Sequence, residues 1–572
     1  MTSRVKRLAI VVPAVLGGWV AWLLLTLPPT AVALPSTPTP AVVRGAYHVH
    51  SVASDGTGTA EQIAAAASRA GLNFVIVTDH GDAFRTPMAP RYFGKVLLID
   101  ATEISTSQGH YVAIGLGRPP YRLAGEARDV VEDVARFGGF GVAAHPDSGR
   151  EALAWAAWDA PVDGIEWLNG DTQWRAMPAW RVFPILVQYA ARPAETLVSR
   201  FTRPQALLQH WDLLTSQRPV VALAGSDAHA RLGLRGKGDP DVERLYLPFP
   251  GYQAVFGAFC LNVELDGAPS GDAVADAQAV VSALKRGSVS TVLSGLASPA
   301  TLSFMAWSST STVRQGGRMA IGPGVMLRAS ANLPPGATIA LLKDGRVVQE
   351  EHAQTLRYAT DRPGVFRVEA RLAGADAMPW ILSNPIYIGL PGPASSGDDT
   401  TAQRAVPYPS APDWQVEHDP SSSGTVTEPA DAGASRETQW RFRLGSGGAG
   451  SAFAAMATSV VDALGRADQL RFRIRATRPM RVSVQLRLKN GSGDRRRVRS
   501  VYADVASRVV AIPLAEMRVA GTGESVALDR RDIGALLFVI DTVNGQPGDQ
   551  GTIWIEALAT VPEAQVRTVN SK

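Results

Sequence analysis

The chain has 572 residues, of which 56 are lysine or arginine and 52 are aspartate or glutamate, giving a formal net charge of +4. This length is too great for one hydrophobic core and predicts about three or four domains. The near balance of charges argues against a nucleic-acid partner, and no nucleic acid is expected. The single cysteine, Cys260, excludes an intrachain disulfide and is expected to be a buried apolar thiol.

The N-terminus has the pattern of an export segment. Arg4, Lys6 and Arg7 precede residues 8–43, which contain no charged residue, and residues 8–27 are nearly all apolar and long enough to span a bilayer. The basic flank is expected to stay inside, so the rest of the chain would work outside the cytoplasm, whether periplasmic, secreted or anchored. The Ala31–Ala33 tripeptide has the form of a signal-peptide cleavage site, so residues 1–40 are either a cleaved signal or an uncleaved membrane anchor, followed by a Pro-rich spacer.

Residues 41–300 alternate between strand-like and helix-like segments. Helices are predicted over 59–70, 126–137 and 272–287; Thr59 is the expected N-cap of the first, and Gly71 is expected to end it. The expected strands are residues 41–49, 73–78, 96–104, 111–115, 141–144, 164–168 and 220–224. This alternation predicts an α/β fold with a parallel sheet and helical crossovers, either a barrel or an open sheet.

Two all-β modules are predicted to follow. Residues 301–392 show period-2 alternation of apolar and polar side chains, as over 364–370, and predict a small β-sandwich. Residues 393–435 are rich in Pro, Ser, Gly, Asp and Thr and predict a linker. Residues 436–565 alternate again and predict a β jelly roll. Neither module shows a catalytic cluster.

Six of the nine histidines fall into short clusters between His48 and His229. Each cluster has a carboxylate beside it or follows a predicted strand. Imidazole and carboxylate together are the ligand set of borderline divalent metals. Because the C-terminal ends of parallel strands meet at one edge, these side chains are expected to converge. The candidate metal ligands are His48, His50, Asp55, His80, Glu103, His110, His145, Asp227 and His229.

The ordered series from His48-Val49-His50 to Asp227-Ala228-His229 resembles the PHP (polymerase and histidinol phosphatase) family over residues 44–260. The resemblance implies a distorted, seven-stranded (β/α) barrel that holds two or three divalent ions, Mn, Fe or Zn. The implied ligands are His48, His50, Glu103 and Asp227 for the first ion, Glu103, His110 and His145 for the second, and Asp55, His80 and His229 for the third.

Two local patterns resemble the small-phosphatase and carbamate-hydrolase branch of that family. One is the setting of His110 after Glu103. The other is the segment 383–387, Ser-Asn-Pro-Ile-Tyr, which resembles a recurring end of the β domain in that branch. The C-terminal module faintly resembles carbohydrate-binding jelly rolls.

The resemblance implies an exported phosphoesterase that hydrolyses a small phosphomonoester or phosphodiester with a metal-bound hydroxide, so no side-chain nucleophile is expected. A carbamate or ester hydrolase is one alternative, because a metal hydroxide also attacks carbonyl carbon. A non-catalytic protein that binds envelope glycans is the other. Asp79 and Asp82 are expected either to orient ligating imidazoles or to stabilise the turn after their strand. Glu166 and Asn169 are candidates to line the substrate pocket.

Overall fold

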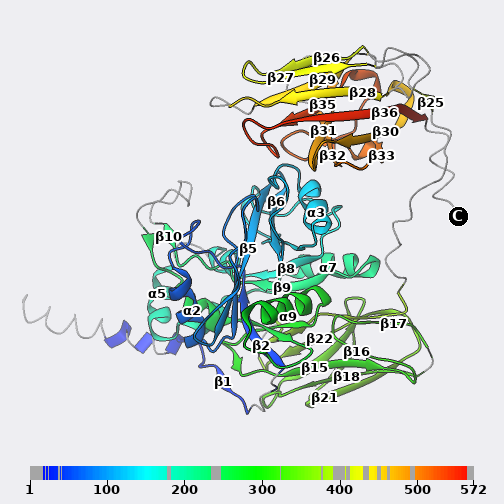
Figure 1. Ribbon diagram of the computed structural model, residues 1–572. Coiled ribbons are helices and arrows are strands. Elements are labelled where there is room, and N and C mark those ends of the chain that lie inside the picture. Colours follow the sequence, from blue (N-terminus) through cyan, green and yellow to red (C-terminus); the bar gives the residue numbers. More distant parts are fainter. Residues whose placement is uncertain are drawn as a thin grey trace, which may run out of the picture.

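The computed structural model covers most of the chain (Figure 1). Among the described residues, no helix is long and apolar enough to cross a membrane. The predicted export segment, residues 8–27, lies largely outside the described part. The structure describes residues 17–19, 21–22, 25–35, 39, 41–176, 182–233, 246–322, 324–374, 378–390, 406–407, 413–428, 437–446, 452–459, 464–489 and 496–562.

The α/β region is built on a mixed sheet whose strands lie in the order β13-β12-β2-β3-β5-β6-β7-β8-β9. Neighbours β2–β3–β5 and β7–β8–β9 are parallel, whereas β6 is antiparallel to both β5 and β7. The strands are β2 (Val42–Tyr47), β3 (Phe74–Val77), β4 (Arg91–Phe93), β5 (Val96–Thr106), β6 (Gly109–Ile114), β7 (Phe140–Ala143), β8 (Gly164–Asn169), β9 (Val221–Gly225), β12 (Cys260–Glu264) and β13 (Val289–Val292).

The prediction of a parallel sheet was therefore wrong at β6, and β12, a strand that the sequence analysis missed, is antiparallel to β2 and to β13. Only Ser107 and Gln108 separate β5 from β6, which is too short for a helical crossover and allows only a hairpin. At the other end of the sheet, the Ser226 N–H donates to the Tyr47 carbonyl (2.7 Å), and Val49 and Ala228 form an isolated parallel bridge. These contacts bring β9 beside β2, but ladder pairing between the two strands is absent from the described residues, so a closed barrel stays a prediction.

Helices cover this sheet, and their ends follow the local sequence. Thr59 caps α2 in a capping box with Gln62, and Gly287 ends α9 in the left-handed conformation (φ 75°) that glycine adopts without strain. The helices are α2 (Ala60–Arg69), α3 (Ala127–Arg136), α4 (Gly170–Arg175), α5 (Val182–Ala191), α6 (Pro193–Val198), α7 (Gln205–Gln217), α8 (Tyr252–Ala258) and α9 (Ala273–Arg286).

The small β region is continuous with the α/β sheet. β23 pairs with β13, and one hydrophobic core runs through both regions. A separate sheet, in the order β16-β15-β18-β21, packs against this extension. The strands are β14 (Ala297–Ser298), β15 (Leu302–Trp307), β16 (Thr312–Arg314), β17 (Arg318–Met319), β18 (Val325–Ala331), β19 (Thr338–Lys343), β20 (Arg346–Glu351), β21 (Thr355–Thr360), β22 (Gly364–Arg371), β23 (Ile381–Ser383) and β24 (Ile386–Ile388).

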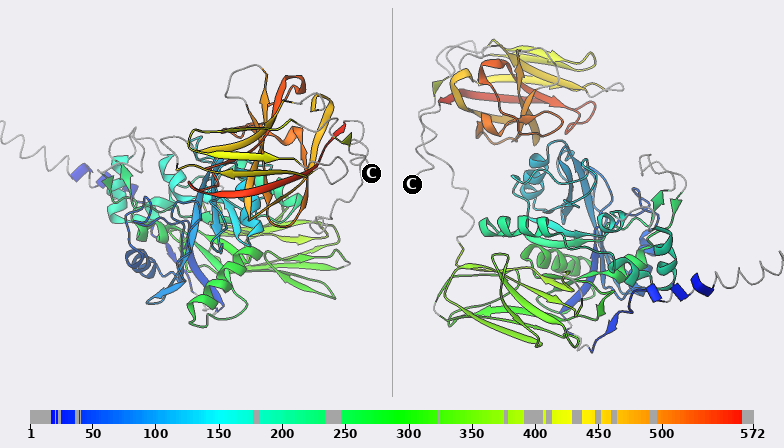
Figure 2. Two further views of the ribbon diagram at one scale, coloured as in Figure 1. Left: turned by 45° about the horizontal axis from the view of Figure 1, so that its top comes forward. Right: turned by 180° about the vertical axis from the view of Figure 1, so that it is seen from behind.

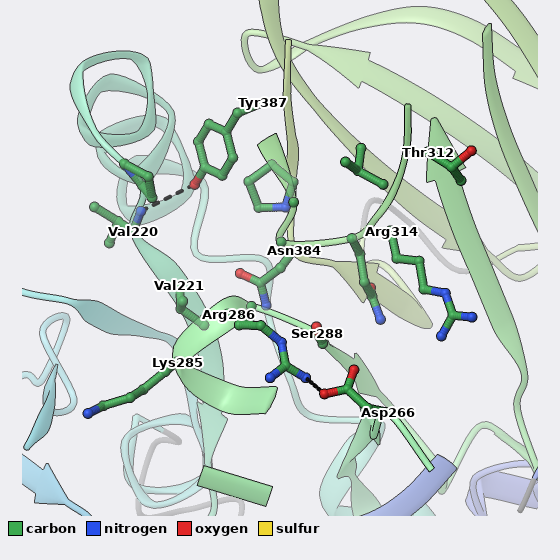
Figure 3. Close-up of a pocket in the computed structure, with 17 residues that line it drawn as sticks. Val220, Val221, Asp266, Lys285, Arg286, Ser288, Thr312, Arg314, Asn384 and Tyr387 are labelled. Atoms are coloured by element: carbon green, nitrogen blue, oxygen red, sulfur yellow. Dashed lines mark hydrogen bonds and ion pairs between the residues drawn. The ribbon is translucent and has the colours of Figure 1, made fainter. Parts of the chain in front are cut away.

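Asn384, from the Ser-Asn-Pro-Ile-Tyr segment, links the small β region to β9. Its side-chain amide donates to the carbonyls of Ala222 and Val289 (both 2.9 Å) and accepts from the Ala222 N–H (2.8 Å). Tyr387 accepts a hydrogen bond from the Val220 N–H (Figure 3). The buried Asn384 amide thus makes the two hydrogen bonds to the Ala222 backbone that a neighbouring strand would otherwise make.

A cavity of about 600 Å³ lies where the small β region meets the start of β9 and the end of α9 (Figure 3). It contains none of the candidate metal ligands. Two of its cations are neutralised, since Arg286 lies 3.1 Å from Asp266 and Arg314 lies 2.7 Å from Glu264. It is also at the N-terminal end of β9, whereas the histidine clusters follow the C-terminal ends of the strands.

The C-terminal module packs two sheets face to face, in the orders β27-β28-β36-β30-β33 and β26-β29-β35-β31-β32-β34. Its strands are β25 (Val406–Pro407), β26 (Gln415–His418), β27 (Ser423–Thr427), β28 (Glu437–Arg443), β29 (Phe453–Thr458), β30 (Ala467–Ala476), β31 (Met480–Leu488), β32 (Arg497–Ala503), β33 (Arg508–Pro513), β34 (Arg518–Val519), β35 (Ile533–Asp541) and β36 (Gln550–Pro562).

Part of the predicted linker belongs to this module. Residues 393–435 include β25, β26 and β27, which pair with β36, β29 and β28. Edge strands bury little apolar surface, so β26 (Gln-Val-Glu-His) and β27 (Ser-Gly-Thr-Val-Thr) need few hydrophobic residues, and this polar composition hid them. The rest of the predicted linker lies outside the described residues.

The C-terminal module is docked on α3 (Figure 1). The buried guanidinium of Arg481 lies 3.0 Å from an oxygen of Asp129 and 2.8 Å from one of Asp133. Arg499 adds a second contact to Asp129 (2.7 Å), and the Asn544 amide donates to two carbonyls of the loop before α3. The face of the sheet that carries Arg481 is therefore covered, at this point, by the α/β region.

Candidate metal centre

The candidate ligands converge at the C-terminal ends of the strands. His48 and His50 follow β2, His80 follows β3, Glu103 and His110 lie on the β5–β6 hairpin, His145 follows β7, and Asp227 and His229 follow β9. His48, His145 and Asp227 have positive φ values of 63°, 29° and 48°, which non-glycine residues seldom adopt. Each such residue costs about 1–3 kcal/mol, so the surrounding fold holds these side chains in place at the expense of stability.

Glu103 is at the centre of the cluster and is fully buried. One of its oxygens, Oε2, lies 3.1 Å from Nε2 of both His48 and His50. Its other oxygen, Oε1, lies 2.9 Å from Nδ1 of His110 and from Nε2 of His145. The two oxygens thus face two different groups of imidazoles, as a carboxylate that bridges two ions would.

Asp55 and Asp227 complete the cluster on the side away from His110. Asp55 lies 2.9 Å from Nε2 of His229, 3.3 Å from Nδ1 of His50 and 3.8 Å from Nε2 of His80. Asp227 Oδ1 lies 3.5 Å from Nε2 of His50. The structure therefore brings all nine predicted side chains together.

Four groups of side chains among the described residues could each hold one ion, and they differ in detail from the ligand sets that the family resemblance implies. The set implied for the third ion is present with His50 added. The set implied for the second ion is divided between two groups, both of which contain Glu103. Within each group the ligand atoms lie within 4.8 Å of one another. The groups are His50–Asp55–His80–His229, His48–Glu103–His145, His48–His50–Asp227 and His80–Glu103–His110.

The electrostatics of the cluster are those of buried carboxylates and imidazoles in direct contact. Burial lowers the pKa of His50, but the adjacent carboxylates of Asp227 and Glu103 favour the charged imidazole, outweigh burial and raise the pKa to about 10. Burial raises the pKa of Glu103, but His48 and other imidazoles hold it well below its usual range. A cation entering the cluster would displace imidazole protons and take over their charge.

The residues fit divalent ions. His50 Nε2 and His80 Nδ1 are buried without a hydrogen-bond partner, although Glu103 Oε2 is only 3.1 and 3.4 Å away. Buried polar atoms are nearly always hydrogen-bonded, so these two nitrogens require another partner. A metal ion bound between the imidazoles and the Glu103 carboxylate would be such a partner. Nitrogen and oxygen donors suit Mn, Fe and Zn.

Glu166 and Asn169 lie behind the site instead of in the wall of its cavity. Glu166 is fully buried; its Oε1 lies 2.5 Å from His48 Nδ1, and its Oε2 accepts from the His145 N–H (2.7 Å) and the Asn169 amide (2.8 Å). A Cβ at Gly225 would collide with this carboxylate, so the glycine in β9 makes room for it. Glu166 therefore orients two candidate ligands, a role that the sequence did not indicate.

Asp79 and Asp82 stabilise turns. Asp79 accepts from the N–H and hydroxyl of Ser51 and from the hydroxyl of Ser54 (2.6–2.7 Å). It thereby holds the loop that carries Asp55. Asp82 pairs with Arg122 (2.6 Å) and contacts no imidazole among the interactions of the described residues. Of the two roles expected for these aspartates, turn formation is the one that the contacts support.

A cavity of about 660 Å³ opens over the cluster. Seven candidate ligands line it, together with side chains that the sequence analysis missed: Ser105, Arg150, Asp171, Arg175 and Arg231. Arg175 pairs with Asp171 (2.5 Å), and Arg231 donates to the Asp55 carbonyl (3.2 Å). Each of the three arginines follows one of the strand-end motifs within a few residues. This position in the sequence could have predicted that the arginines line the cavity.

No protein-family model matches the sequence, and no curated protein matches it. Among solved structures, the chain is similar to a two-domain protein from Bacteroides vulgatus that contains a predicted PHP-like metal-dependent phosphoesterase. The two sequences are 14% identical, the similarity covers 62% of this chain and 99% of that chain, and the TM-score is 0.30. It is also similar to the family 11 carbohydrate-binding module from Clostridium thermocellum in complex with a mixed-linked tetrasaccharide (15% identity, 26% and 88% covered, TM-score 0.21). Both similarities are distant and carry no functional conclusion for this chain.

Proposed function

We propose that the chain is an extracytoplasmic, metal-dependent phosphoesterase of the PHP type, with a distorted seven-stranded barrel as its catalytic domain. One observation supports this most strongly. Nine imidazole and carboxylate side chains converge at the base of a cavity whose wall carries three arginines. Such a site suits the hydrolysis of an anionic ester.

The residues divide into those that would hold ions and those that would hold substrate. The four groups around Glu103 and Asp55 would bind two or three ions, with Glu103 shared between them. When bound, divalent ions polarise a phosphoryl group and lower the pKa of a water molecule. Glu166 keeps the His48 imidazole in the orientation that presents its Nε2 to Glu103 and Asp227.

The arginines favour a phosphoester over a carbamate. Arg175 and Arg231 are half-buried at the cavity wall, and Arg150 is exposed at its rim. Guanidinium groups form paired hydrogen bonds with phosphate oxygens, whereas a neutral carbamate has no negative charge for them to neutralise. The glycan-binding alternative has no comparable feature, because α3 covers part of one sheet face of the C-terminal module.

The proposal is tested with the purified full-length protein, after metal analysis, using manganese and two substrates, para-nitrophenyl phosphate and an aryl carbamate. Phosphate hydrolysis should exceed carbamate hydrolysis. Glu103→Gln should lower the phosphatase rate about 100-fold or more, whereas Glu151→Gln, at an exposed neighbouring position, should not. Carbamate hydrolysis without phosphate hydrolysis would refute the proposal, and a protein that binds no metal would favour the glycan-binding alternative.

Arg175→Gln separates the substrates more sharply. Loss of one charge-assisted hydrogen bond to phosphate should lower kcat/KM for the aryl phosphate about tenfold. The aryl carbamate should change less than about threefold, since no charge is lost against it. An equal loss on both substrates would show that Arg175 supports the fold of the site and not its specificity.

A further inference from the structure

The described part of the N-terminal segment is an integral part of the catalytic domain. Val32 and Ala33 form strand β1, which pairs in parallel with β14, and the N–H groups of Val32 and Leu34 donate to carbonyls of the domain (2.9 and 3.0 Å). Further back, the Gln188 side chain donates to the Thr26 carbonyl (2.9 Å) and Arg192 donates to the carbonyl of Pro28, which is buried. Segment and domain are thus joined along most of residues 26–35.

These contacts bear on the cleavage-like tripeptide. The last two residues of this tripeptide, Val32 and Ala33, form β1, so cleavage after Ala33 would remove the strand and every contact before it. A leader that is to be discarded has no need of hydrogen bonds to the mature fold. The contacts therefore favour retention of the segment over its removal.

The same segment is connected to the wall of the metal cavity by a row of aromatic contacts. The row starts at α5, whose Gln188 holds Thr26 and which is followed directly by Arg192, the residue that holds Pro28. Tyr189 packs on Phe249 (ring centroids 4.7 Å), Phe249 on Trp174 (5.7 Å), and the guanidinium of Arg175, a lining residue, lies 4.4 Å from the Trp174 ring centroid. Figures 1 and 2 agree that α5 lies beside the N-terminal segment, with strands β10 (Leu232–Gly233) and β11 (Tyr246–Leu247) on the same side.

Apolar side chains are exposed at this end. The hairpin β10 (Leu232–Gly233) and β11 (Tyr246–Leu247) starts directly after Arg231, which lines the cavity and packs on Tyr246 (5.2 Å). Tyr246 and Leu247 are both exposed, as are Trp19 and Trp22, and Leu25 is 86% exposed. Tyrosine and tryptophan are the residues that prefer the membrane–water interface. The segment 8–27 that leads to these side chains contains no charge.

We propose that the N-terminal segment is retained, and that it holds the mouth of the metal cavity against a lipid bilayer through the exposed side chains of β11 and those of Trp19, Trp22 and Leu25. The substrate is then a phosphoester carried by a membrane lipid. The substrate class rests on the function proposed above, whereas the contact with the bilayer does not. The arginines at the cavity wall would bind the phosphate while the lipid chains stay in the membrane.

Retention is tested on the full chain expressed in a host that exports it. The N-terminal sequence and intact mass of the protein from the membrane fraction are measured. We expect a chain that includes residues 26–35. A mature chain that starts at Leu34 would overturn the proposal.

Orientation is tested with a single fluorescent label on the full chain in vesicles of phosphatidylcholine and phosphatidylglycerol. Leu247→Cys is compared with Val348→Cys, a strand residue of equal exposure (39% and 38%) in the small β region, and the native Cys260 is only 2% exposed and should not react. Brominated lipids should quench a bimane label at position 247 and not at position 348. Quenching at neither position, or equally at both, would overturn the proposed orientation.

The substrate class is tested by comparing a phosphoester lipid in the same vesicles with soluble para-nitrophenyl phosphate. Leu247→Glu should lower the rate on the vesicle substrate about tenfold by placing a charge at the interface, with the soluble rate unchanged within about twofold. Val348→Glu should change neither rate. Equal rates on vesicles for both variants would refute the lipid substrate. No soluble activity in the wild type would instead refute the phosphoesterase, and the quenching result would still decide the bilayer contact.

Discussion

Glu166→Gln isolates the hydrogen bond that orients His48. In the native site one carboxylate oxygen accepts from His48 Nδ1 and the other accepts from the His145 N–H and the Asn169 amide. With Nδ1 as the donor, Nε2 is left with its lone pair directed at Glu103 and Asp227. A ligating histidine needs this tautomer.

Glutamine has nearly the same shape but only one accepting oxygen. If that oxygen keeps the bonds to His145 and Asn169, the glutamine NH₂ faces His48 Nδ1, and the proton of the imidazole moves to Nε2, where it blocks a metal ion. If the amide is reversed, its NH₂ faces two donors and the bonds are lost. Removal of a carboxylate that orients a metal-binding histidine typically costs about 10- to 100-fold in metal affinity, or about 1.4–2.7 kcal/mol.

The assay is competition for Mn²⁺ or Zn²⁺ with a chelator at one fixed pH, since metal binding releases protons. Glu151→Gln, at an exposed position, is the matched control and should bind as the wild type does. Circular dichroism of both metal-free variants should be native. A Glu166→Gln protein that is folded and binds metal within about threefold of wild type would refute the role of Glu166.

Three further substitutions test how the domains are held together. Burial alone would raise the pKa of Glu369, but Arg203 and Arg367 lower it from about 4.5 in the unfolded chain to about 2 in the folded protein. The ionised Glu369 therefore stabilises the folded protein above pH 4.5, and this stabilisation is lost as the pH falls towards 2. Glu369→Gln should lower the free energy of unfolding at pH 7 by about 3 kcal/mol and flatten its fall between pH 5 and 2 in urea titrations; an unaltered pH profile would contradict this. Arg481→Met removes a buried guanidinium that pairs with two buried carboxylates, Asp129 and Asp133; it should cost about 3–5 kcal/mol and should let limited proteolysis release the C-terminal module. Asn384→Leu removes three buried hydrogen bonds, should cost about 3 kcal/mol, and should weaken metal binding at the end of β9, whereas unchanged stability would refute its link to β9.

The sequence predicted the elements that bear the candidate ligands because local patterns determine them. Buried strands read as apolar runs, and the clusters follow those runs directly, so convergence at one edge followed from parallel pairing. The antiparallel β6 was missed, yet His110 still reaches Glu103, since a hairpin also places the two side chains side by side.

The remaining features depend on contacts between distant residues. In the sequence Glu166 is only one residue of a predicted buried strand. Its contact with His48 exists because the fold brings β8 close to the end of β2. The burial of Arg481 depends on two carboxylates of α3 that are far away in the sequence. Edge strands β26 and β27 have almost no apolar signal of their own. In each case a tertiary partner decides the role, and periodicity carries no information about it.

The pairing of β1 with β14 sets an order for folding. Val32 lies near the start of the chain, while its partner Ala297 is made only after the whole α/β region, and the amide of Asn332 that donates to the Pro35 carbonyl (3.1 Å) is made later still. Closing such a large loop costs conformational entropy that local contacts do not offset. Strand β1 is synthesised early and is therefore among the last segments to be fixed, and its docking marks an α/β region that is already complete.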